Sequence, residues 1–278
     1  LVRDFRWAIP ARYNIGTACA DMWAATEPER VALVRCETDG SLAPVGYGDL
    51  KRQSDALAHA LRERGIGRGD RVAAQLPNMP EAVVAMLATA SLGAVWSSCS
   101  PDFGVQGVID RFGQIEPKVL IAAAGYRYAG KNLDLTAKLN EILERLPSLQ
   151  QLVVVPYSNK AARAGDFRSA ARVILWQDFY QAGGEPKFTP VSFEQPLYIL
   201  YSSGTTGLPK PIVHGHGGIL LEHHKLSSLH YNLKPDDRMF FFTTTGWMMW
   251  NFLLSGLLTK ASIVLYDGNP GQPDPGVL

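Results

Sequence analysis

Residues 198–214, YILYSSGTTGLPKPIVH, join a short apolar run to a loop of glycine and hydroxyl side chains. The apolar run, 198–201, predicts a buried strand, because short apolar runs bounded by turn residues are typical of strands in a sheet core. Glycines let backbone N–H groups approach an anion closely, while serine, threonine and lysine add donors and positive charge. We therefore predict that this loop binds a polyphosphate through Ser202, Ser203, Gly204, Thr205, Thr206, Gly207 and Lys210.

Two other interpretations of this loop are weaker. A plain flexible turn explains glycine and serine, but it does not require six small polar residues followed by Pro-Lys. A Walker-type loop has serine or threonine directly after its lysine, whereas Pro211 follows Lys210, and the glycine spacing also differs. A phosphate-binding loop of another type is the better hypothesis.

The segment YSSGTTGLPK, residues 201–210, resembles the phosphate-binding signature of the adenylate-forming superfamily. This superfamily includes acyl-CoA synthetases, luciferases and the adenylation domains of peptide synthetases. Pro211 departs from the glycine that usually follows the lysine, which indicates a subgroup. The resemblance covers residues 15–278. It implies that the loop holds the β- and γ-phosphates of ATP with Mg²⁺, and that Thr205 and Thr206 lie nearest the metal.

Three further segments indicate the subgroup. Residues 97–104, SSCSPDFG, 108–120, VIDRFGQIEPKVL, and 207–218, GLPKPIVHGHGG, are similar to the acetoacetyl-CoA synthetase subgroup. This resemblance implies an acid–thiol ligase that activates a short-chain carboxylate, acetoacetate first, with ATP through an acyl-adenylate and transfers it to coenzyme A. Acetyl-, propionyl- and medium-chain acyl-CoA synthetases remain alternatives. A non-catalytic nucleotide-binding module is the alternative from another class.

Residues 243–251, TTTGWMMWN, follow a predicted strand and begin a predicted helix. By the resemblance, Gly246 and Trp247 match the stretch that lines the acyl pocket, and Met248 and Met249 take its variable positions. Methionines would give a small acyl group an adaptable apolar wall. Ordinary core packing explains each of these side chains about equally well.

Residues 125–131, GYRYAGK, come directly after a predicted strand. The resemblance implies that Arg127 contacts the 3′-phosphate of coenzyme A and that Lys131 replaces a second arginine, without the bidentate geometry of a guanidinium. A solvated surface loop with two ordinary charges is an equally good explanation.

The sequence gives little support for zinc or for serine hydrolysis. His214, His216, His223 and His224 lie close together, but their spacing matches no usual zinc pattern. We expect His214 to brace the phosphate loop instead. No GxSxG motif is present, so a serine hydrolase is disfavoured.

The apolar patterns predict an α/β fold of parallel sheets covered by helices, because the strands are continuously apolar and alternate with helices. By the resemblance, this is part of the large N-terminal domain of an adenylate-forming enzyme. The main predicted strands are 31–36, 71–76, 94–97, 119–124, 152–155, 239–242 and 261–265. The main predicted helices are 51–64, 81–92, 105–115, 139–146, 218–228 and 247–258.

We expect a first α/β subdomain over residues 1–190 and the start of a second, with the phosphate loop, over residues 191–278. The resemblance implies that the small C-terminal domain with the catalytic lysine is missing. The chain is therefore expected to be a truncated and inactive portion of an enzyme. In that case residues 261–265 would form an exposed sheet edge that promotes association.

Composition excludes some partners. The sequence has 278 residues, of which 46% are hydrophobic, so a sizeable core can form. With 27 basic and 26 acidic residues, the formal net charge of +1 gives no electrostatic case for nucleic acid or an anionic membrane. Cys19, Cys36 and Cys99 form no CxxC pattern, which favours reduced thiols and a cytoplasmic location. The sequence does not indicate an oligomeric state.

Overall fold

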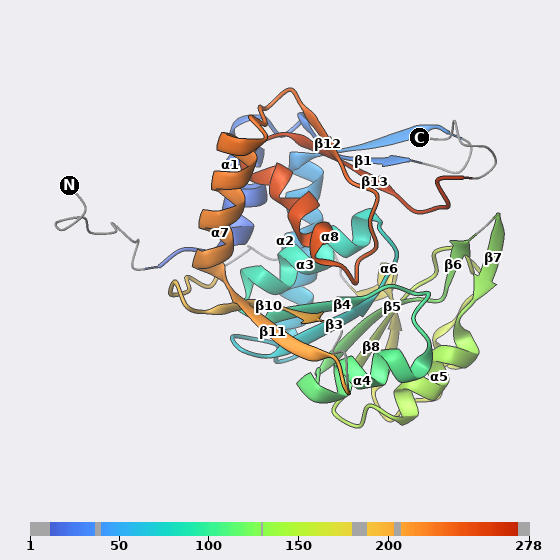
Figure 1. Ribbon diagram of the computed structural model, residues 1–278. Coiled ribbons are helices and arrows are strands. Elements are labelled where there is room, and N and C mark those ends of the chain that lie inside the picture. Colours follow the sequence, from blue (N-terminus) through green and yellow to red (C-terminus); the bar gives the residue numbers. More distant parts are fainter. Residues whose placement is uncertain (1–11, 37–39, 129, 180–187, 203–206, 272–278) are drawn as a thin grey trace.

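The computed structural model describes residues 12–36, 40–128, 130–179, 188–202 and 207–271 (Figure 1). The chain forms two large sheets with helices between them and a further helical layer on the outer face of the larger sheet (Figure 1). The predicted α/β class is confirmed.

The larger sheet has seven strands in the order β11-β10-β4-β3-β5-β8-β9. The pairings from β10 to β9 are parallel, whereas β11 pairs antiparallel with β10. The strands are β3 (Arg71–Gln75), β4 (Val95–Cys99), β5 (Val119–Ala123), β8 (Gln151–Val155), β9 (Arg172–Leu175), β10 (Pro196–Ser202) and β11 (Lys210–Gly215). The central strands β4, β5 and β8 are buried along their whole length, as continuously apolar strands covered on both faces require.

The smaller sheet has the order β12-β13-β1-β2. Its strands are β1 (Val31–Cys36), β2 (Leu42–Gly46), β12 (Arg238–Phe240) and β13 (Ser262–Tyr266). Strand β13 pairs in parallel with both β12 and β1, so the expectation of an exposed edge at 261–265 is wrong. The strand is interior because β1, from the start of the chain, covers one side of it.

Helices fill the space between the sheets and cover the larger sheet (Figure 1). They are α1 (Met22–Thr26), α2 (Tyr47–Glu63), α3 (Pro80–Ser91), α4 (Val105–Ile115), α5 (Thr136–Glu144), α6 (Trp176–Phe179), α7 (His216–Lys225) and α8 (Met248–Leu253). Helix α3 is buried on all sides, which its uniformly apolar sequence predicts. Helices α4 and α5 pack on the outer face of the seven-stranded sheet through residues such as Phe112 and Leu139.

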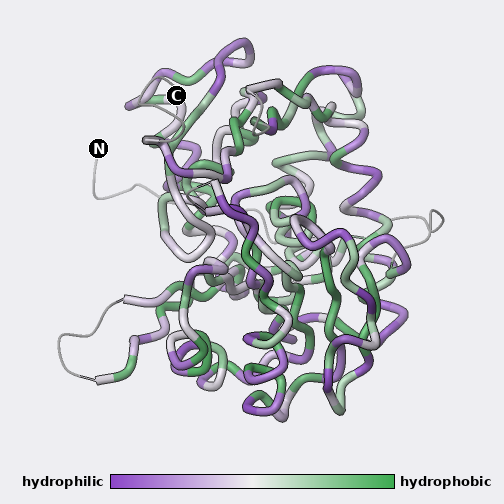
Figure 2. Tube along the Cα trace, turned by 90° about the vertical axis from the view of Figure 1, so that its right-hand side faces the viewer, coloured by the Kyte–Doolittle hydropathy of each residue, from purple (hydrophilic) through white to green (hydrophobic). Residues whose placement is uncertain are grey.

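One apolar core joins the two sheets. Leu33 of β1, Leu57 of α2, Val72 of β3 and Trp250 of α8 belong to the same buried cluster. In Figure 2, hydrophobic residues gather along the strands and inner helices, while the outer turns are largely hydrophilic. This shared core fixes the carboxyl ends of strands from both sheets relative to one another.

Several boundaries differ from the predicted ones. Helix α2 begins at Tyr47 rather than Lys51, and the predicted helix 247–258 divides into α8 and a 3₁₀ turn, Leu254–Thr259. Residues 125–134 form a hairpin, β6 (Gly125–Tyr128) with β7 (Lys131–Asp134), where a loop was expected.

The expected division of the chain at residue 190 stays a prediction. Each of the two large sheets combines strands from before and after that residue, so strand pairing does not mark a boundary there. Among the described residues, no helix combines the length and apolar character that crossing a membrane requires.

Candidate functional site

The predicted phosphate loop connects the two strands of an antiparallel hairpin. Strand β10 leads into it and β11 leaves it, and Ser202 pairs directly with Lys210 at its base. The structure therefore brings together two of the predicted phosphate-binding residues. Ser203, Gly204, Thr205 and Thr206 lie outside the described residues.

The described end of the loop has features of an open binding segment. Lys210 is exposed, so its ammonium group is accessible. Gly207 has φ of +117°, a conformation that side-chain-bearing residues rarely adopt, and a Cβ built there would meet nothing within 4 Å. Glycine is needed at this position for the backbone conformation rather than for close packing.

The turn that precedes α8 is tied to the carboxyl ends of β3 and β4. Thr245 is fully buried, and its hydroxyl donates to the carbonyl oxygens of Leu76 (2.6 Å) and Cys99 (3.2 Å). In return, Ser98 Oγ donates to the carbonyl oxygen of Thr245 at 2.6 Å. Thr245 thus links the seven-stranded sheet to the start of α8 through hydrogen bonds.

The predicted acyl-pocket residues are not core residues in the structure. Trp247 is 63% exposed and Met248 is 53% exposed, while Met249 is half-buried. Core packing applies instead to Trp250, which stacks on Trp96 with ring centroids 6.3 Å apart and donates to Asn78 Oδ1. Trp247 and Met248 therefore present apolar surface at the start of α8.

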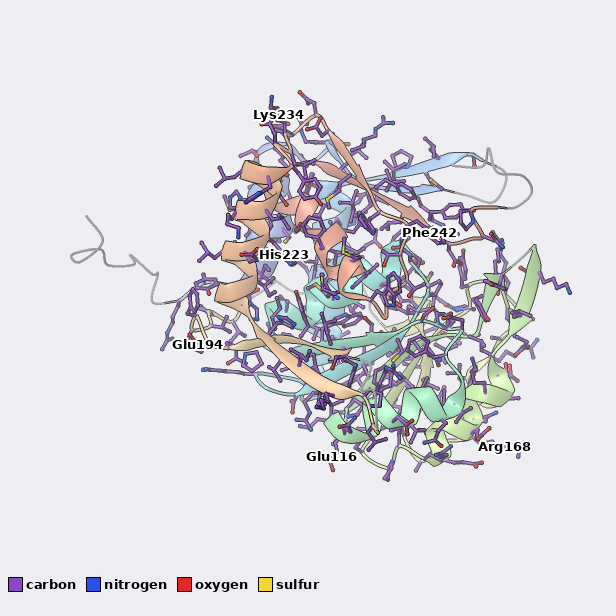
Figure 3. All side chains as sticks on the ribbon, viewed as in Figure 1. Glu116, Arg168, Glu194, His223, Lys234 and Phe242 are labelled. Atoms are coloured by element: carbon purple, nitrogen blue, oxygen red, sulfur yellow. The ribbon has the colours of Figure 1, made fainter. Side chains whose placement is uncertain are left out.

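A cavity of about 90 Å³ lies where strands of both sheets end. Its walls come from the segments that follow β3, β4, β12 and β13 and from strand β6, and they include Asp102, Arg127, Phe242, Thr243, Thr244 and Asp267. Phe242, just past the end of β12, is labelled in Figure 3. In α/β proteins, ligands bind outside the carboxyl ends of parallel strands. Two segments far apart in the sequence, around Arg127 and around Thr243, therefore meet at one site.

Arg127 and Lys131 have different surroundings. Arg127 is half-buried, lines the cavity and lies 5.7 Å from the centroid of the Tyr157 ring, so a fully solvated loop position is wrong for it. Lys131 is exposed at the tip of the hairpin, opposite Tyr128. The structure brings the arginine to the cavity and leaves the lysine at the surface.

Asp267 and Tyr157 lie close to Arg127. Burial raises the pKa of Asp267 to about 6, while a hydrogen bond to Tyr157 and the charges of Arg127 and Arg35 act in the opposite direction. Arg35 lies over the Tyr157 ring at 5.3 Å. The carboxyl groups of Asp102 and Asp267 give this cavity both signs of charge. Both aspartates directly follow or nearly follow a strand, and that position is the signal by which the sequence could have indicated them.

The histidines are spread over different contacts. The His214 ring packs on Tyr198, which it faces across the hairpin at 5.2 Å, toward the end of the hairpin away from Ser202. Burial lowers the pKa of His216 and of His223 to about 4. Across the described ranges, no group of three or more His, Cys, Asp or Glu is arranged to hold a metal ion.

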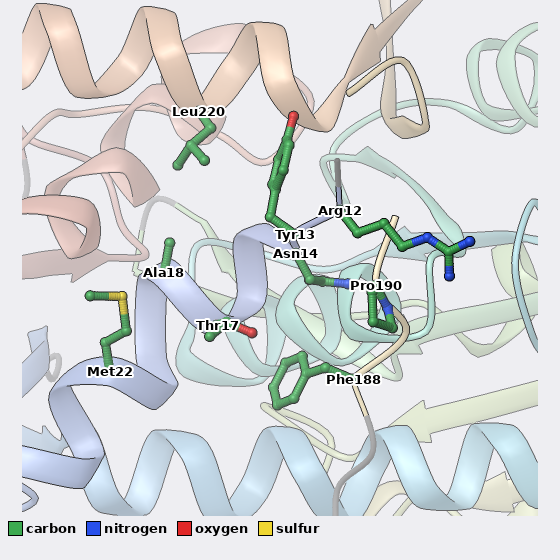
Figure 4. A pocket seen from close by; sticks show the side chains of 9 residues that line it. All are labelled: Arg12, Tyr13, Asn14, Thr17, Ala18, Met22, Phe188, Pro190 and Leu220. Carbon is green, nitrogen blue, oxygen red and sulfur yellow. The ribbon is translucent and has the colours of Figure 1, made fainter. Parts of the chain in front are cut away.

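A second cavity, of about 320 Å³, lies beside the segment that leads into β10 rather than beside the loop that follows it (Figure 4). It is lined by Arg12, Tyr13, Asn14, Thr17, Ala18, Met22, Phe188, Pro190 and Leu220. None of the predicted site residues lines it.

Comparisons with known proteins agree with this architecture. The family described as AMP-binding enzyme matches residues 20–278. The acetoacetyl-coenzyme A synthetase of Rhizobium meliloti (strain 1021) is 50% identical over 233 residues, which are 84% of this chain and 35% of that protein. The acetoacetyl-CoA synthetase of Danio rerio is 44% identical over 259 residues, 91% of this chain and 38% of its own.

Among solved structures, acetoacetyl-CoA synthetase from Streptomyces lividans superimposes with a TM-score of 0.90 at 46% identity, covering 97% of this chain and 40% of that one. The chain thus spans between 35% and 40% of the length of these relatives. Because the family match extends over nearly all of its residues, the chain belongs to the AMP-binding enzyme family.

Proposed function

We propose that the protein in which this chain occurs is an AMP-forming acid–thiol ligase that activates acetoacetate with ATP and transfers it to coenzyme A. One observation carries the proposal: relatives named acetoacetyl-CoA synthetase are 44% to 50% identical over 84% to 91% of this chain. The family match over residues 20–278 includes the β10–β11 hairpin with the predicted phosphate loop (the phosphate hairpin), the 243–251 stretch and the residues of the cavity around Arg127.

The phosphate hairpin fits a polyphosphate. Ser202 and Lys210 face each other at its base, and the intervening sequence adds Ser203, Gly204, Thr205 and Thr206. In the proposed reaction a carboxylate oxygen attacks the α-phosphorus of ATP, and pyrophosphate leaves. The hairpin would hold the β- and γ-phosphates and offset the charge that develops on the leaving group. Mg²⁺ would add positive charge at the same oxygens, and the threonine hydroxyls are the residues proposed to lie nearest to it.

The cavity side fits the second half of the reaction. The thiol of coenzyme A would displace AMP from the acyl-adenylate and form the thioester. Arg127 offers a guanidinium for the 3′-phosphate, and Trp247, Met248 and Met249 offer apolar surface for the acyl group, next to Gly246. Lys131, exposed on the hairpin, is proposed as a weaker phosphate contact. A cytoplasmic location, and the division of the chain at residue 190, belong to the same proposal.

The first experiment is acid-dependent exchange of radiolabelled pyrophosphate into ATP by the full-length protein in which this sequence occurs. Acetoacetate, acetate, propionate and butyrate are compared, with octanoate as a medium-chain acid. Exchange that is fastest with acetoacetate supports the proposal. Exchange that is fastest with another acid supports the ligase chemistry but shows that acetoacetate is not the preferred substrate. Binding of ATP without exchange for any acid supports a non-catalytic nucleotide-binding module.

A further inference from the structure

Helix α4 is hydrogen-bonded to both ends of the phosphate loop. The Tyr201 hydroxyl, just before the loop, donates to the carbonyl oxygen of Arg111 at 3.0 Å. The Gln114 amide Nε2 donates to the carbonyl oxygen of Pro209, just after the loop, at 2.8 Å. Residues three apart lie on the same face of a helix. One face of α4 therefore holds both points at which the loop leaves the hairpin.

The Arg111 side chain is held between two aromatic rings. Its guanidinium carbon lies 4.7 Å from the centroid of the Phe103 ring and 5.8 Å from that of Tyr201. Its Nη1 also donates to the carbonyl oxygen of Gly107 at 2.8 Å. Burial raises the pKa of Tyr201, so its hydroxyl remains a neutral donor for the contact with α4. Arg111 thus contacts the strand end through its side chain and through its backbone.

Phe103 extends this arrangement to the turn before α8. A Cβ built on Gly246 would lie 3.3 Å from Phe103 Cζ and 3.3 Å from the backbone nitrogen of Ser100. The ring therefore packs closely on Gly246, directly before the exposed Trp247 and Met248. Arg111 contacts Tyr201 at the end of β10 and also contacts Phe103, which packs on the turn at Gly246. The end of β10 and this turn are therefore connected through two side chains.

Gln114 is exposed, so its side chain contributes little to the apolar core. Its amide donates both to Asp110 O at 2.6 Å and to Pro209 O at 2.8 Å, which joins its own helix to the far end of the loop. Loss of this hydrogen bond should change the free energy of folding little. The hydrogen bond nevertheless restricts where Lys210, the residue after Pro209, can lie.

We infer that Arg111 and Gln114 are positioning residues that fix the phosphate loop relative to the turn bearing Trp247 and Met248. The inference rests on the proposed function, in which those two segments hold ATP and the acid. It assigns to α4 the alignment of the two reactants, whereas the loop itself supplies the groups that touch phosphate.

The test compares Gln114→Ala with Gln106→Ala in the full-length protein in which this sequence occurs. Gln106 is a matched control on the same helix: it is exposed, its amide nitrogen donates to Asp110 Oδ1, and its amide oxygen accepts from Arg145 Nη2, away from the loop. Loss of one neutral hydrogen bond predicts that Gln114→Ala raises the KM for ATP about 3-fold to 10-fold in pyrophosphate exchange. The KM for the acid should change less than about twofold, and Gln106→Ala should match wild type.

Arg111→Lys provides a second variant, since lysine keeps the charge but lacks the planar group that lies between two rings. We expect Arg111→Lys and Arg111→Ala to show the same loss, about 10-fold in kcat/KM for ATP. Rescue by lysine would show that only the charge matters, and that result overturns positioning by stacking.

Hydrogen–deuterium exchange of the peptide spanning residues 201–210 gives a readout that needs no turnover. Faster exchange in Gln114→Ala than in Gln106→Ala, at equal thermal stability, supports the inference. Equal exchange and equal KM values in the two variants overturn it. A wild-type protein without pyrophosphate exchange refutes the proposed function separately, and the peptide measurement then still decides whether α4 positions the loop.

Discussion

The phosphate hairpin and the cavity around Arg127 both lie at the carboxyl ends of strands, yet they differ in charge and in origin. The hairpin is one continuous segment, and the described residues that pair at the base of its loop are Ser202, with a hydroxyl, and Lys210, with a positive charge. The cavity is assembled from five separate segments and combines Arg127 with Asp102 and Asp267. A contiguous site whose charged side chain is positive suits a polyanion. A site with both positive and negative side chains suits a ligand that must be recognised selectively.

The largest expected effect is on the hairpin. Lys210→Ala removes the exposed cation paired with Ser202, and kcat/KM for ATP in pyrophosphate exchange should fall about 100-fold, because hydrogen bonds to charged groups are the strongest of their kind. Lys160→Ala, which removes an exposed lysine outside the proposed sites, is the control and should keep the wild-type rate of pyrophosphate exchange. Activity of Lys210→Ala within twofold of wild type would show that the hairpin is not the phosphate site.

The cavity should respond to a different substrate. Arg127→Ala is expected to raise the KM for coenzyme A about 10-fold, because it removes the half-buried guanidinium that is proposed to bind the 3′-phosphate. Dephospho-coenzyme A, which lacks that phosphate, should show no such change, and pyrophosphate exchange should stay at the wild-type rate. An equal rise in KM for both thiols would place the 3′-phosphate elsewhere.

The mixed charge of the cavity also predicts a pH dependence of stability. The pKa of Asp267 is raised from 3.8 to about 6 in the folded state, so folding favours its protonated form. Its contribution to stability is therefore present below about pH 4 and is lost as the pH rises through about 6. Asp267→Asn should reduce the decline in unfolding free energy between pH 4 and pH 7 by about 2 kcal/mol, measured by urea denaturation.

Other groups titrate in the same range, so that comparison uses the difference between variant and wild type. Burial raises the pKa of Asp21 to about 6, and it lowers the pKa of His216 and His223 to about 4. These contributions are common to both proteins and cancel in the difference. An identical pH profile for Asp267→Asn and wild type would show that Asp267 carries no penalty when it is ionised.

The smallest effect is expected at the exposed apolar side chains at the start of α8. Met248→Ala should change the ratio of kcat/KM for acetoacetate to that for butyrate about threefold, because it removes part of the wall proposed to contact the acyl group. Stability should change by less than about 0.5 kcal/mol, since Met248 is 53% exposed. Met22→Ala, at 51% exposure, is the matched control. An unchanged ratio would show that Met248 does not contact the acyl group.

The two regions also show what could be predicted from the sequence. The hairpin loop is a local motif, so its residues could be named before the structure was known. The central strands β4, β5 and β8 could be predicted as well, because strands buried on both faces are continuously apolar. The segment containing Arg127 was recognised, but its hairpin was not, since β7 is exposed along its whole length and carries no apolar signal.

The strands that were missed lie mainly at sheet edges. Strand β11 is mostly exposed and contains Pro211, which an edge strand tolerates because proline has no N–H to donate. Its pairing partner is nevertheless its nearest neighbour in sequence. The aspartates behind Arg127 were missed for another reason: Asp102 and Asp267 meet only because β4 and β13, from different sheets, end at the same place. Such proximity follows from pairing between distant strands, which a local pattern does not contain.

The position of β13 between β12 and β1 has a consequence for biosynthesis. Ser262 Oγ donates to the carbonyl oxygen of Val31, a contact between residues 231 positions apart. Strand β1 can therefore pair with β13 only after nearly all of this sequence has emerged from the ribosome. Until then β1 and β2 form an unsupported hairpin whose free edge can pair with another chain. Strand β1 is synthesised long before its partner β13, so the nascent chain has a long interval in which a chaperone that covers β1 would favour correct folding.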